Sequence, residues 1–431
     1  MKSEQVRQDA PRHIRNAAAV THLNGQARAV LDPVAVKAAF DEITSWPGYA
    51  PTPLVPLPGV AARAGVGTVL YKDESHRFGL GSFKALGGAY AVLRVVLQKL
   101  REQGIETNAA ELMAGAHRNE TSRITVVCAT DGNHGRSVAW GAQMFGCLCR
   151  IYIHENVSAD REAGIAVYGA EVIRLAGDYD ESVRICAREA DQNGWTLVAD
   201  TNAGGGSDVI PTMVTQGYTI IVHELLDQLN EWPTHVFIPA GVGGLAAAVS
   251  GQWALQAGTE RPRMIVVEPH AADCVFRALR DGDPRPLEGN VNSFMACLSA
   301  GEVSPVAWPV LRQAVNDVVT IADRDAIETL RALADGRYGD APLVSGESGC
   351  APVAALLALR DQPAIRAELG LNSQSRVLAI GSEGATAPEV WESVVGRSPE
   401  RLTCDSKRFA MDALGAHGDH RHAGAAVRFQ K

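Results

Sequence analysis

The sequence predicts an α/β protein with open, doubly wound sheets of mostly parallel strands. Short runs of β-branched residues alternate with helical segments of about 10–15 residues, the spacing that is typical of βαβ units. Glycine-containing turns directly follow two of the predicted strands, at the strand ends where such sheets bind ligands. The 431 residues, of which 46% are hydrophobic, suffice for one large or two medium domains with a deep core.

The predicted elements follow a polar leader and a proline-rich extended segment at 46–58. Each strand is a short β-branched run, and each helix is a longer segment between two such runs. In chain order they are strand 124–130, helix 136–145, strand 149–154, helix 160–168, strand 171–176, helix 179–193, strand 196–199, strand 234–240, an Ala-rich helix, strand 264–269 and strand 377–380.

The residues from about 405 onward lack sustained periodicity, so we expect a loosely attached tail. His417, His420 and His422 lie in this segment, and they fit a solvated tail better than a metal site. We therefore expect no metal.

The charge composition excludes several classes of function. The 40 Lys and Arg residues against 49 Asp and Glu residues give a net charge of −9 without a basic block, which argues against a nucleic-acid partner. The N-terminus has no apolar signal region, and no apolar run approaches the roughly 18 residues of a membrane span. The eight cysteines form no CxxC pair, and Cys147 and Cys149 are too close together for a relaxed disulfide. We expect reduced, mostly buried thiols in a cytoplasmic protein.

Lysine is unusually scarce, which limits where amine chemistry can occur. No lysine lies between Lys99 and Lys407. The seven lysines are Lys2, Lys37, Lys72, Lys84, Lys99, Lys407 and Lys431. Most of them lie at the chain ends or in solvated segments, and Lys72 is expected near a site but without glycine neighbours.

The segment AGVGGLA (240–246) follows a predicted strand and precedes a helix. Its glycines allow backbone N–H groups to approach an anion, and the helix N-terminus favours negative charge. The phosphate of a cofactor is the preferred interpretation. The pattern also matches a dinucleotide fingerprint, with Glu268 at the end of the next strand, and a plain tight turn remains a third possibility.

Lys84 follows Ser82 and Phe83 between glycine-rich flanks, at a predicted helix start. Schiff-base chemistry requires partial desolvation of the amine, which lowers its pKa, and close packing around glycines can supply it. A solvated helix lysine is the alternative.

The turn TDGNHG (130–135) also lies between a predicted strand and a predicted helix. Asp131 and Asn133 either cap the helix or act chemically, with Asn133 on a ring hydroxyl and Asp131 in acid–base work. The N–H groups of Gly132, Asn133 and His134 would form a carboxylate site at the helix start.

The lysine, the glycine loop and the amide turn together suit pyridoxal 5'-phosphate, which requires an imine lysine, a phosphate site and a ring-side amide. The glycine-rich segments SGESG (345–349) and GSEGAT (381–386) would complete the surroundings of the ring. A nicotinamide dehydrogenase built on the glycine loop would leave Lys84 and the TDGNHG turn without a role.

The combination of SFK, GNH, GVGG and GSEG resembles the fold type II pyridoxal-phosphate enzymes, the tryptophan synthase β and threonine dehydratase group. More narrowly, three segments resemble diaminopropionate ammonia-lyase: YKDESHRFGLGSFKALGGAYA, CATDGNHGRSVAWGA and IPTMVTQGY. The resemblance covers roughly residues 46–391. Aspartate at the start of the TDGNHG turn is its most specific sign.

The resemblance implies roles for individual residues. Lys84 would form the Schiff base with the cofactor, Phe83 would pack near the ring, Asn133 would contact the ring hydroxyl and Ser382 would face the pyridine nitrogen. The phosphate would be held by Gly241, Val242, Gly243, Gly244 and Leu245. Asp131 would be the base for a D-substrate and Lys84 the base for an L-substrate, with Asp200 as a second catalytic aspartate. Ser82, Asp131, Gly132, His134 and Asp200 would contact the substrate.

The implied reaction is β-elimination from 2,3-diaminopropionate, D and L, to pyruvate and ammonia. A neutral pyridine beside Ser382 is a weaker electron sink, which favours elimination because the leaving group removes the charge. The family pattern A-W-E-G-Y after Asp200 and Thr201 is replaced here by 202–207, NAGGGS, so the substrate is open. Serine, threonine or 3-hydroxyaspartate are alternatives, and a non-catalytic cofactor-binding or amino-acid-binding protein is a third.

The resemblance also implies a domain organisation. Residues 1–87 and 206–431 would form a large cofactor-binding domain, and residues 88–205 a small mobile domain, with the active site between them. A homodimer is implied by the family alone.

Overall fold

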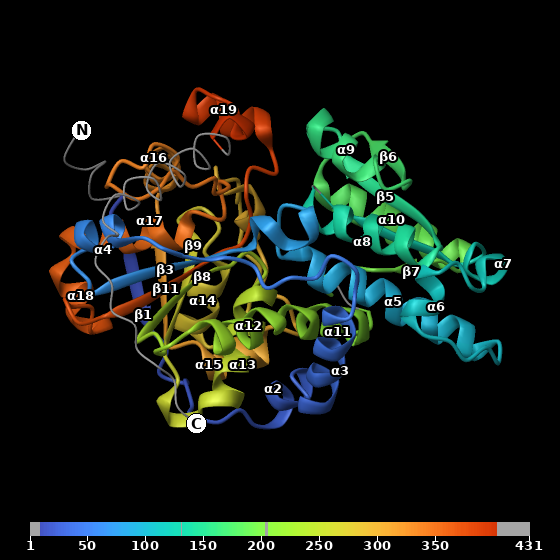
Figure 1. The fold of residues 1–431 in the computed structure, drawn as a ribbon, viewed down its shortest axis with the longest axis horizontal. Helices are drawn as coiled ribbons and strands as arrows, with labels where there is room; N and C mark the ends of the chain where they lie inside the picture. Colours follow the sequence, from blue (N-terminus) through green and yellow to red (C-terminus); the bar gives the residue numbers. More distant parts are fainter. Residues whose placement is uncertain (1–8, 131, 203–205, 403–431) are drawn as a thin grey trace, which may run out of the picture.

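The computed structural model describes residues 9–130, 132–202 and 206–402. Two sheets organise these residues, and they lie side by side in Figure 1. We call the seven-stranded sheet with its helices the large lobe and the four-stranded sheet with its helices the small lobe. The predicted α/β class with two mostly parallel sheets is confirmed.

The large sheet has the order β1-β10-β9-β8-β11-β3-β2, and its five inner strands are parallel. The two edge strands β1 and β2 are antiparallel to their neighbours. The strands are β1 (Arg12–Arg15), β2 (Leu54–Pro56), β3 (Thr68–Asp73), β8 (His235–Pro239), β9 (Arg263–Pro269), β10 (Asp317–Ile321) and β11 (Arg376–Gly381).

The small sheet has the order β6-β5-β4-β7 and is entirely parallel. Its strands are β4 (Thr125–Ala129), β5 (Leu148–His154), β6 (Glu171–Leu175) and β7 (Thr196–Leu197). Its helices are α6 (Ala109–Met113), α7 (Arg118–Thr121), α8 (Asn133–Phe145), α9 (Ala159–Ala166) and α10 (Tyr179–Asn193).

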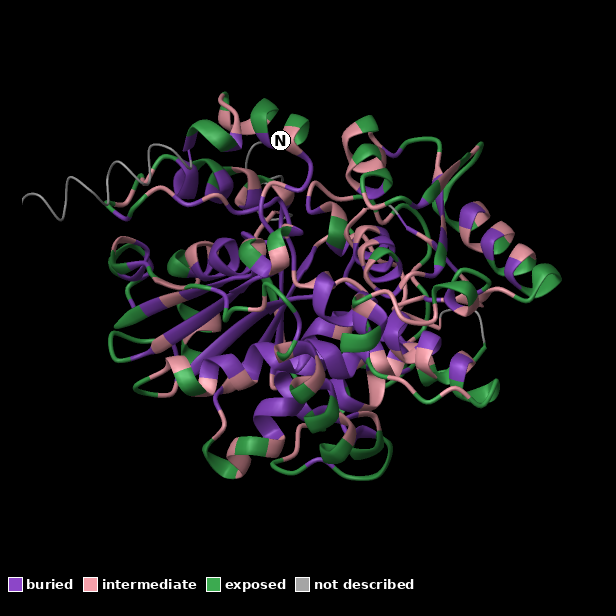
Figure 2. Ribbon diagram, turned by 45° about the vertical axis from the view of Figure 1, so that its right-hand side comes forward, coloured by how far each residue is buried: buried purple, intermediate pink, exposed green. Residues whose placement is uncertain are grey.

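Alternating side chains of the large sheet build two cores, because successive residues of a strand point to opposite faces. Val236 and Ile238 of β8 pack into one core, and Phe237 packs into the other. The first core is covered by α2 (Gly25–Val30), α3 (Pro33–Thr44), α11 (Val209–Tyr218), α12 (Ile220–Gln228), α13 (Gly244–Ala257), α14 (Cys274–Asp281) and α15 (Trp308–Ala314). The second is covered by α4 (Pro58–Ala64), α16 (Asp323–Ala334), α17 (Ala351–Ala358), α18 (Pro363–Leu369) and α19 (Pro388–Val395). Figure 2 shows the buried strands between helices with exposed outer surfaces.

One helix, α5 (Lys84–Glu102), packs against both lobes. A Cβ on Gly87 would lie 2.5 Å from Cε1 of Tyr218 in α11, and a Cβ on Gly88 would overlap Ser137 in α8. The absence of side chains at these two positions therefore lets α5 approach both neighbours closely. Because α5 runs through the predicted boundary at 87/88, the exact domain division remains a prediction.

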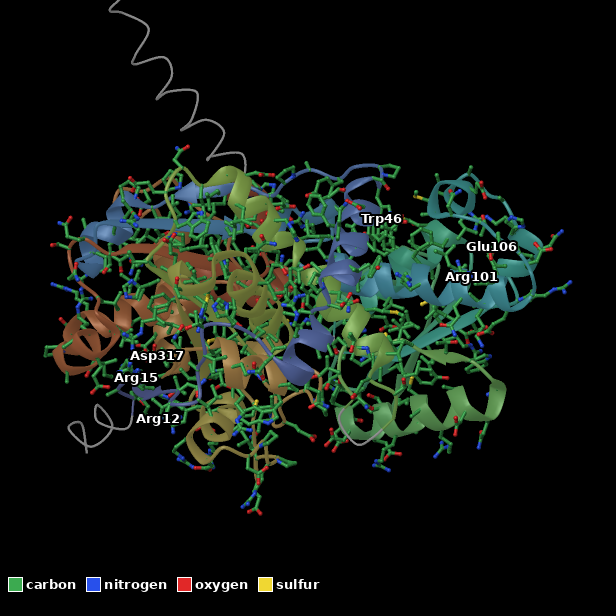
Figure 3. All side chains as sticks on the ribbon, turned by 90° about the horizontal axis from the view of Figure 1, so that it is seen from below. Arg12, Arg15, Trp46, Arg101, Glu106 and Asp317 are labelled. Carbon is green, nitrogen blue, oxygen red and sulfur yellow. The ribbon has the colours of Figure 1, made fainter. Side chains whose placement is uncertain are left out.

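The long axis of the molecule runs from the edge of the large sheet to the far end of α5. Figure 3 labels Arg12 and Arg15 of β1 and Asp317 of β10 at one end, and Arg101 and Glu106 at the other. Among the described residues, no helix is both long and apolar enough to cross a membrane.

Four strands, β1, β2, β3 and β10, were not predicted from the sequence, and α8 begins three residues before its predicted start. Buried charges explain why two of these strands, β3 and β10, were not predicted. Lys72 in β3 is fully buried and pairs with Glu224 at 2.6 Å, and Asp317 in β10 is buried between Arg263 and His13. Charged residues normally indicate exposed positions, so the charge at the end of each strand argued against a buried strand although both contain a short apolar run, TVLY in β3 and VVTI in β10.

Candidate active site

A cavity of about 740 Å³ lies between the two lobes and contains the centre of the site. The small lobe contributes residues near the ends of β4, β5 and β6, and the large lobe contributes the loop after β8, the loop after β11 and residues 286–302. This position outside the carboxyl ends of parallel strands is where open α/β sheets bind ligands.

Lys84 is the first residue of α5 and projects into this cavity. Its Nζ forms an ion pair with Asp200 and lies 5.2 Å from the ring centre of Phe83 and 5.8 Å from that of Tyr218. Burial lowers the pKa of Lys84, but the Asp200 carboxylate, together with Tyr218 and Cys297, outweighs burial and the pKa is raised overall. The predicted depression of the lysine pKa is therefore wrong for this arrangement, because an acidic partner accompanies the desolvation.

Asp200 and His134 lie on the small-lobe side of the same cavity. Burial raises the pKa of Asp200, whereas Lys84 and His134 lower it, and the result lies well below the usual range. His134 Nε2 lies 2.8 Å from the carbonyl oxygen of Val198, and burial lowers the pKa of the ring. The imidazole is therefore neutral at pH 7, and Lys84 faces an ionised carboxylate.

The glycine loop lines the cavity opposite the small lobe, from Ala240 to Leu245. Gly243 has φ +95°, and Gly244 begins α13. A Cβ on Gly241 would lie 2.9 Å from the carbonyl oxygen of Cys297. Gly241 and Gly243 therefore have no room for a side chain, which lets the backbone at the N-terminus of α13 approach an anion in the cavity, as phosphate binding requires.

Glu268 does not face this cavity. It is fully buried and accepts hydrogen bonds of 2.8 Å from the backbone N–H groups of Val275 and Phe276. A dinucleotide fingerprint needs this acidic residue to bind the ribose. Here its carboxylate binds the first backbone N–H groups of α14 instead, which argues against the nicotinamide alternative.

The ring-side residues come from α8 and from the loop after β11. Asn133 is the first residue of α8, and its Nδ2 donates to Glu383 Oε2 and lies 3.6 Å from Cys297 Sγ. Ser382 lines the cavity and is 4% exposed. Its carbonyl oxygen accepts from Phe83 N–H at 3.1 Å, which fixes the loop beside Lys84.

Two predicted substrate residues do not line the cavity. Ser82 is buried and forms an isolated bridge with Glu383. The Gly132 N–H donates to Thr130 Oγ1 at 3.1 Å, so the proposed carboxylate site loses this donor to its own turn. Asp131 lies outside the described residues, as do residues 203–205 of the altered loop and the histidines of the tail.

Comparison with known proteins places this geometry in a family. Residues 45–383 match the model of the pyridoxal-phosphate dependent enzymes. The diaminopropionate ammonia-lyase of Salmonella typhimurium is 37% identical over 82% of this chain and 90% of its own length. That of Escherichia coli K12 is 36% identical over 86% and 94%. The chain belongs to the diaminopropionate ammonia-lyases.

Solved structures support the membership. The Escherichia coli diaminopropionate ammonia-lyase in complex with D-serine superposes with a TM-score of 0.80 at 32% identity, covering 89% of this chain and 96% of that one. Threonine deaminase isoform 2 from Solanum lycopersicum, at 21% identity and a TM-score of 0.68, shares the fold.

Like its family, this ammonia-lyase is a pyridoxal 5'-phosphate enzyme, and its cavity fits that cofactor. Lys84 would supply an amine, the loop 240–245 would supply phosphate donors, and Asn133 and Ser382 would supply polar groups at the ring. These assignments remain predictions for the individual residues.

The sequence analysis missed Glu383, Cys297 and Glu347. Glu383 lies in the cavity wall and accepts from Asn133 Nδ2, Thr386 Oγ1 and Cys297 Sγ. A signal existed, because both glycine-rich segments SGESG and GSEGAT were expected around the ring. A buried position was nevertheless not predicted for the glutamate of either segment, because a lone glutamate in a loop is usually exposed.

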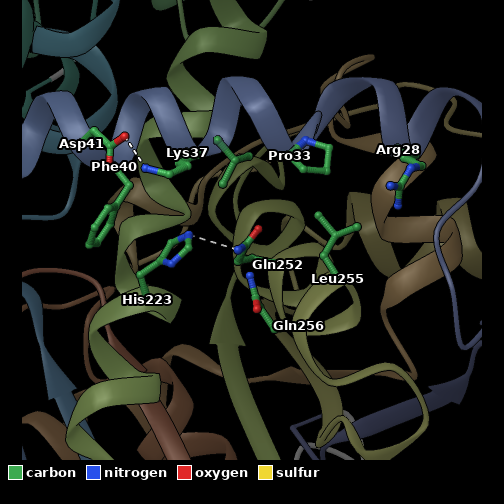
Figure 4. Close-up of a pocket in the computed structure, with 10 residues that line it drawn as sticks. Arg28, Pro33, Lys37, Phe40, Asp41, His223, Gln252, Leu255 and Gln256 are labelled. Carbon is green, nitrogen blue, oxygen red and sulfur yellow. Dashed lines mark hydrogen bonds and ion pairs between the residues drawn. The ribbon is translucent and has the colours of Figure 1, made fainter.

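A second, smaller cavity of about 470 Å³ lies between α3, α12 and α13 (Figure 4). Lys37, another lysine that could in principle form a Schiff base, lines this cavity. Its side chain is 72% exposed and pairs with Asp41 four residues later on α3. At its floor Gln252 Nε2 lies 3.1 Å from His223 Nε2. It has no glycine loop, so it lacks the groups that the ammonia-lyase cofactor needs.

Proposed function

We propose that this enzyme catalyses β-elimination from 2,3-diaminopropionate, as both D- and L-isomers, to pyruvate and ammonia. The named relatives support this reaction. The observation in the structure that supports the substrate is the charge of the cavity.

The described residues of the cavity wall are strongly acidic. Lys84 is the one Lys or Arg among them, and it is committed to the cofactor. The described carboxylates in the wall are Asp178, Asp180, Asp200, Glu302 and Glu383. Such a cavity attracts a substrate with an additional ammonium group and repels one with an additional carboxylate. Diaminopropionate carries the additional amine, 3-hydroxyaspartate carries the additional carboxylate, and serine and threonine carry neither.

The residues of the chain bind the cofactor and transfer the protons. Bound pyridoxal phosphate supplies the electron sink that makes the α-proton of the substrate acidic. Lys84 Nζ accepts this proton from the L-isomer, and the Asp131 carboxylate accepts it from the D-isomer. The Asp200 carboxylate pairs with the ammonium that Lys84 becomes after it has accepted this proton. Amides of 241–245 hold the phosphate, and Asn133 and Ser382 orient the ring.

Exclusion of water is part of the same proposal. Phe83 and Tyr218 form an edge-to-face pair with ring centres 4.7 Å apart beside Lys84. These rings limit water at the amine, which protects a reactive unsaturated product until it leaves the site.

The test is a pyruvate assay on the purified holoenzyme. D- and L-diaminopropionate, D- and L-serine, threonine and 3-hydroxyaspartate are compared at equal concentration, while the visible absorbance confirms bound cofactor. We expect diaminopropionate to give the highest kcat/KM and 3-hydroxyaspartate the lowest. If neither isomer of diaminopropionate gives pyruvate while the visible band is present, the substrate assignment is wrong and the dehydratase alternative replaces it.

We also propose that the enzyme is a homodimer, on the family resemblance alone, and that it is cytoplasmic, on its cysteine pattern. Light scattering of the purified holoenzyme measures the mass directly, and a monomeric mass would contradict the assembly.

A further inference from the structure

Two buried glutamates belong to neighbouring loops at the active-site cavity, one in its wall and one behind it. Neither has a role in the proposed reaction. Glu347 belongs to SGESG and Glu383 to GSEGAT, and each is 1% exposed. Their loops are in backbone contact, since the Gly346 N–H donates to the Glu383 carbonyl oxygen at 2.9 Å. A Cβ on Gly346 would overlap the carbonyl of Gly384. The two carboxylates are therefore held side by side within the large lobe.

Each glutamate is contacted by a residue of the small lobe. Arg161 on α9 forms an ion pair with Glu347, with 3.1 Å between Nη2 and Oε1. Asn133 at the start of α8 donates to Glu383. The two contacts thus join the same two large-lobe loops to two neighbouring helices of the small lobe.

Arg161 also packs against the turn that precedes Asn133. A Cβ placed on Gly132 would lie 3.6 Å from Arg161 Cδ, an ordinary van der Waals contact. The arginine therefore lies between Gly132 and Glu347. Its side chain is 15% exposed and that of Glu347 is 2% exposed.

Burial makes this ion pair consequential. Glu347 Oε2 is buried with no hydrogen-bond partner among the described residues. Burial and the neighbouring Glu383 raise the pKa of Glu347 to about 7, and Arg161 is the described cation that opposes this shift and favours the carboxylate. Removing one member of a buried pair leaves an uncompensated charge, whereas removing both does not. The ion pair is therefore one of the contacts that hold the small lobe to the large lobe, beside the packing of α5 and the Asn133–Glu383 hydrogen bond.

We propose that Arg161 is a positioning residue, whose ion pair with Glu347 holds the small lobe against the large lobe and thereby keeps Asn133 on Glu383 at the cavity wall. Arg161 does not line the cavity, so it acts through the turn and not on the substrate. The kinetic part of this inference rests on the proposed function, whereas its structural part does not.

The test is a double-mutant cycle on the holoenzyme, with Arg161→Met, Glu347→Gln and the double variant. Hydrogen exchange without substrate is measured for α8 and α9, and KM and kcat are measured on diaminopropionate. We expect Arg161→Met to accelerate exchange in both helices and to raise KM about tenfold with a smaller change in kcat, the size of a strong pairwise coupling. Glu347→Gln added to Arg161→Met should restore part of both losses. Arg161→Lys should fall between wild type and Arg161→Met.

The matched control is an ion pair within the small lobe. Arg150 donates to both carboxylate oxygens of Glu171, at 2.8 Å each, on neighbouring strands β5 and β6. Arg150→Met removes an arginine from the same lobe without touching the other lobe, and we expect KM to stay unchanged.

Two results would overturn the inference. Independent, multiplying effects of Arg161→Met and Glu347→Gln would show that the pair is not coupled. A raised KM with unchanged exchange in α8 and α9 would show that Arg161 acts on the substrate directly. Failure of the proposed function would appear differently, as an absence of pyruvate in wild type, and it would leave the exchange measurements readable.

Discussion

Replacement of Gly243 by alanine tests the glycine loop as the phosphate site. Gly243 has φ +95°, and its added Cβ would lie 2.6 Å from Leu311 Cδ1. The left-handed conformation costs an alanine about 1–2 kcal/mol. Displacing Leu311 from its rotamer costs about 0.5–1.5 kcal/mol more. The total strain is about 1.5–3.5 kcal/mol by these two magnitudes.

This strain is relieved when the loop leaves its left-handed conformation, and its N–H groups then no longer converge. Cofactor affinity should therefore fall by about 10- to 300-fold if the loop relieves all of this strain, at 1.4 kcal/mol per tenfold change. Any part of the strain that the loop retains appears instead as a lower free energy of unfolding. Absorbance titration of the apoenzyme with pyridoxal phosphate measures the first quantity, and chemical denaturation measures the second.

Gly282→Ala is the matched control. Gly282 also has a positive φ, +73°, at the end of α14, and nothing lies within 4 Å of an added Cβ. We expect it to lose about 1–2 kcal/mol of unfolding free energy with unchanged cofactor affinity. Wild-type affinity in Gly243→Ala would refute the assignment of the loop. An equal loss of affinity in Gly282→Ala would show that general destabilisation is the cause.

Three further predictions concern the active site, and a fourth concerns the buried Glu268. Asp131→Asn should abolish turnover of D-diaminopropionate and spare much of the L-reaction in the pyruvate assay, and equal loss on both isomers would make Asp131 structural. Asp200→Asn should lower the pKa of Lys84, because burial still lowers that pKa while the opposing carboxylate is gone; the pH dependence of amine labelling in the apoenzyme measures this, and an unchanged midpoint would contradict it. Glu302→Gln should raise KM for diaminopropionate more than for serine, whereas equal changes would argue against charge selection at the cavity. Burial raises the pKa of Glu268 to about 8, above the roughly 4.3 of an unfolded glutamate. The folded state thus binds the extra proton, so stability should fall as pH rises from about 4.3 to 8 and level off above that range. Thermal unfolding of wild type and Glu268→Gln across this range checks the slope, which the variant should lack.

Local signals made part of this site predictable from the sequence. Lys84 with its glycine flanks and the loop 240–246 are each contained in a few consecutive residues, and the structure places both at one cavity. The scarcity of lysine left few candidates for the Schiff-base lysine. Lys72 is not among them in the structure, because it is buried in an ion pair with Glu224.

Long-range contacts could not be predicted in the same way. Asn133 and Glu383 meet across 250 positions of sequence, and Arg161 and Glu347 across 186. Nothing in either segment indicates its partner, because the pairing is set by how the two lobes pack. The strand β10 was missed for a related reason, since the partners of Asp317 are His13 of β1 and Arg263 of β9, which lie far away in the sequence.

The close packing of α5 has a consequence for redesign of this enzyme. Gly87 and Gly88 hold the helix of Lys84 between two neighbours, so a methyl group added there would shift the amine itself. Efforts to change the leaving group by directed evolution should therefore leave this helix untouched. The segment 286–302 offers a safer library, because it lines the cavity from Pro286 to Glu302 without supporting the lysine.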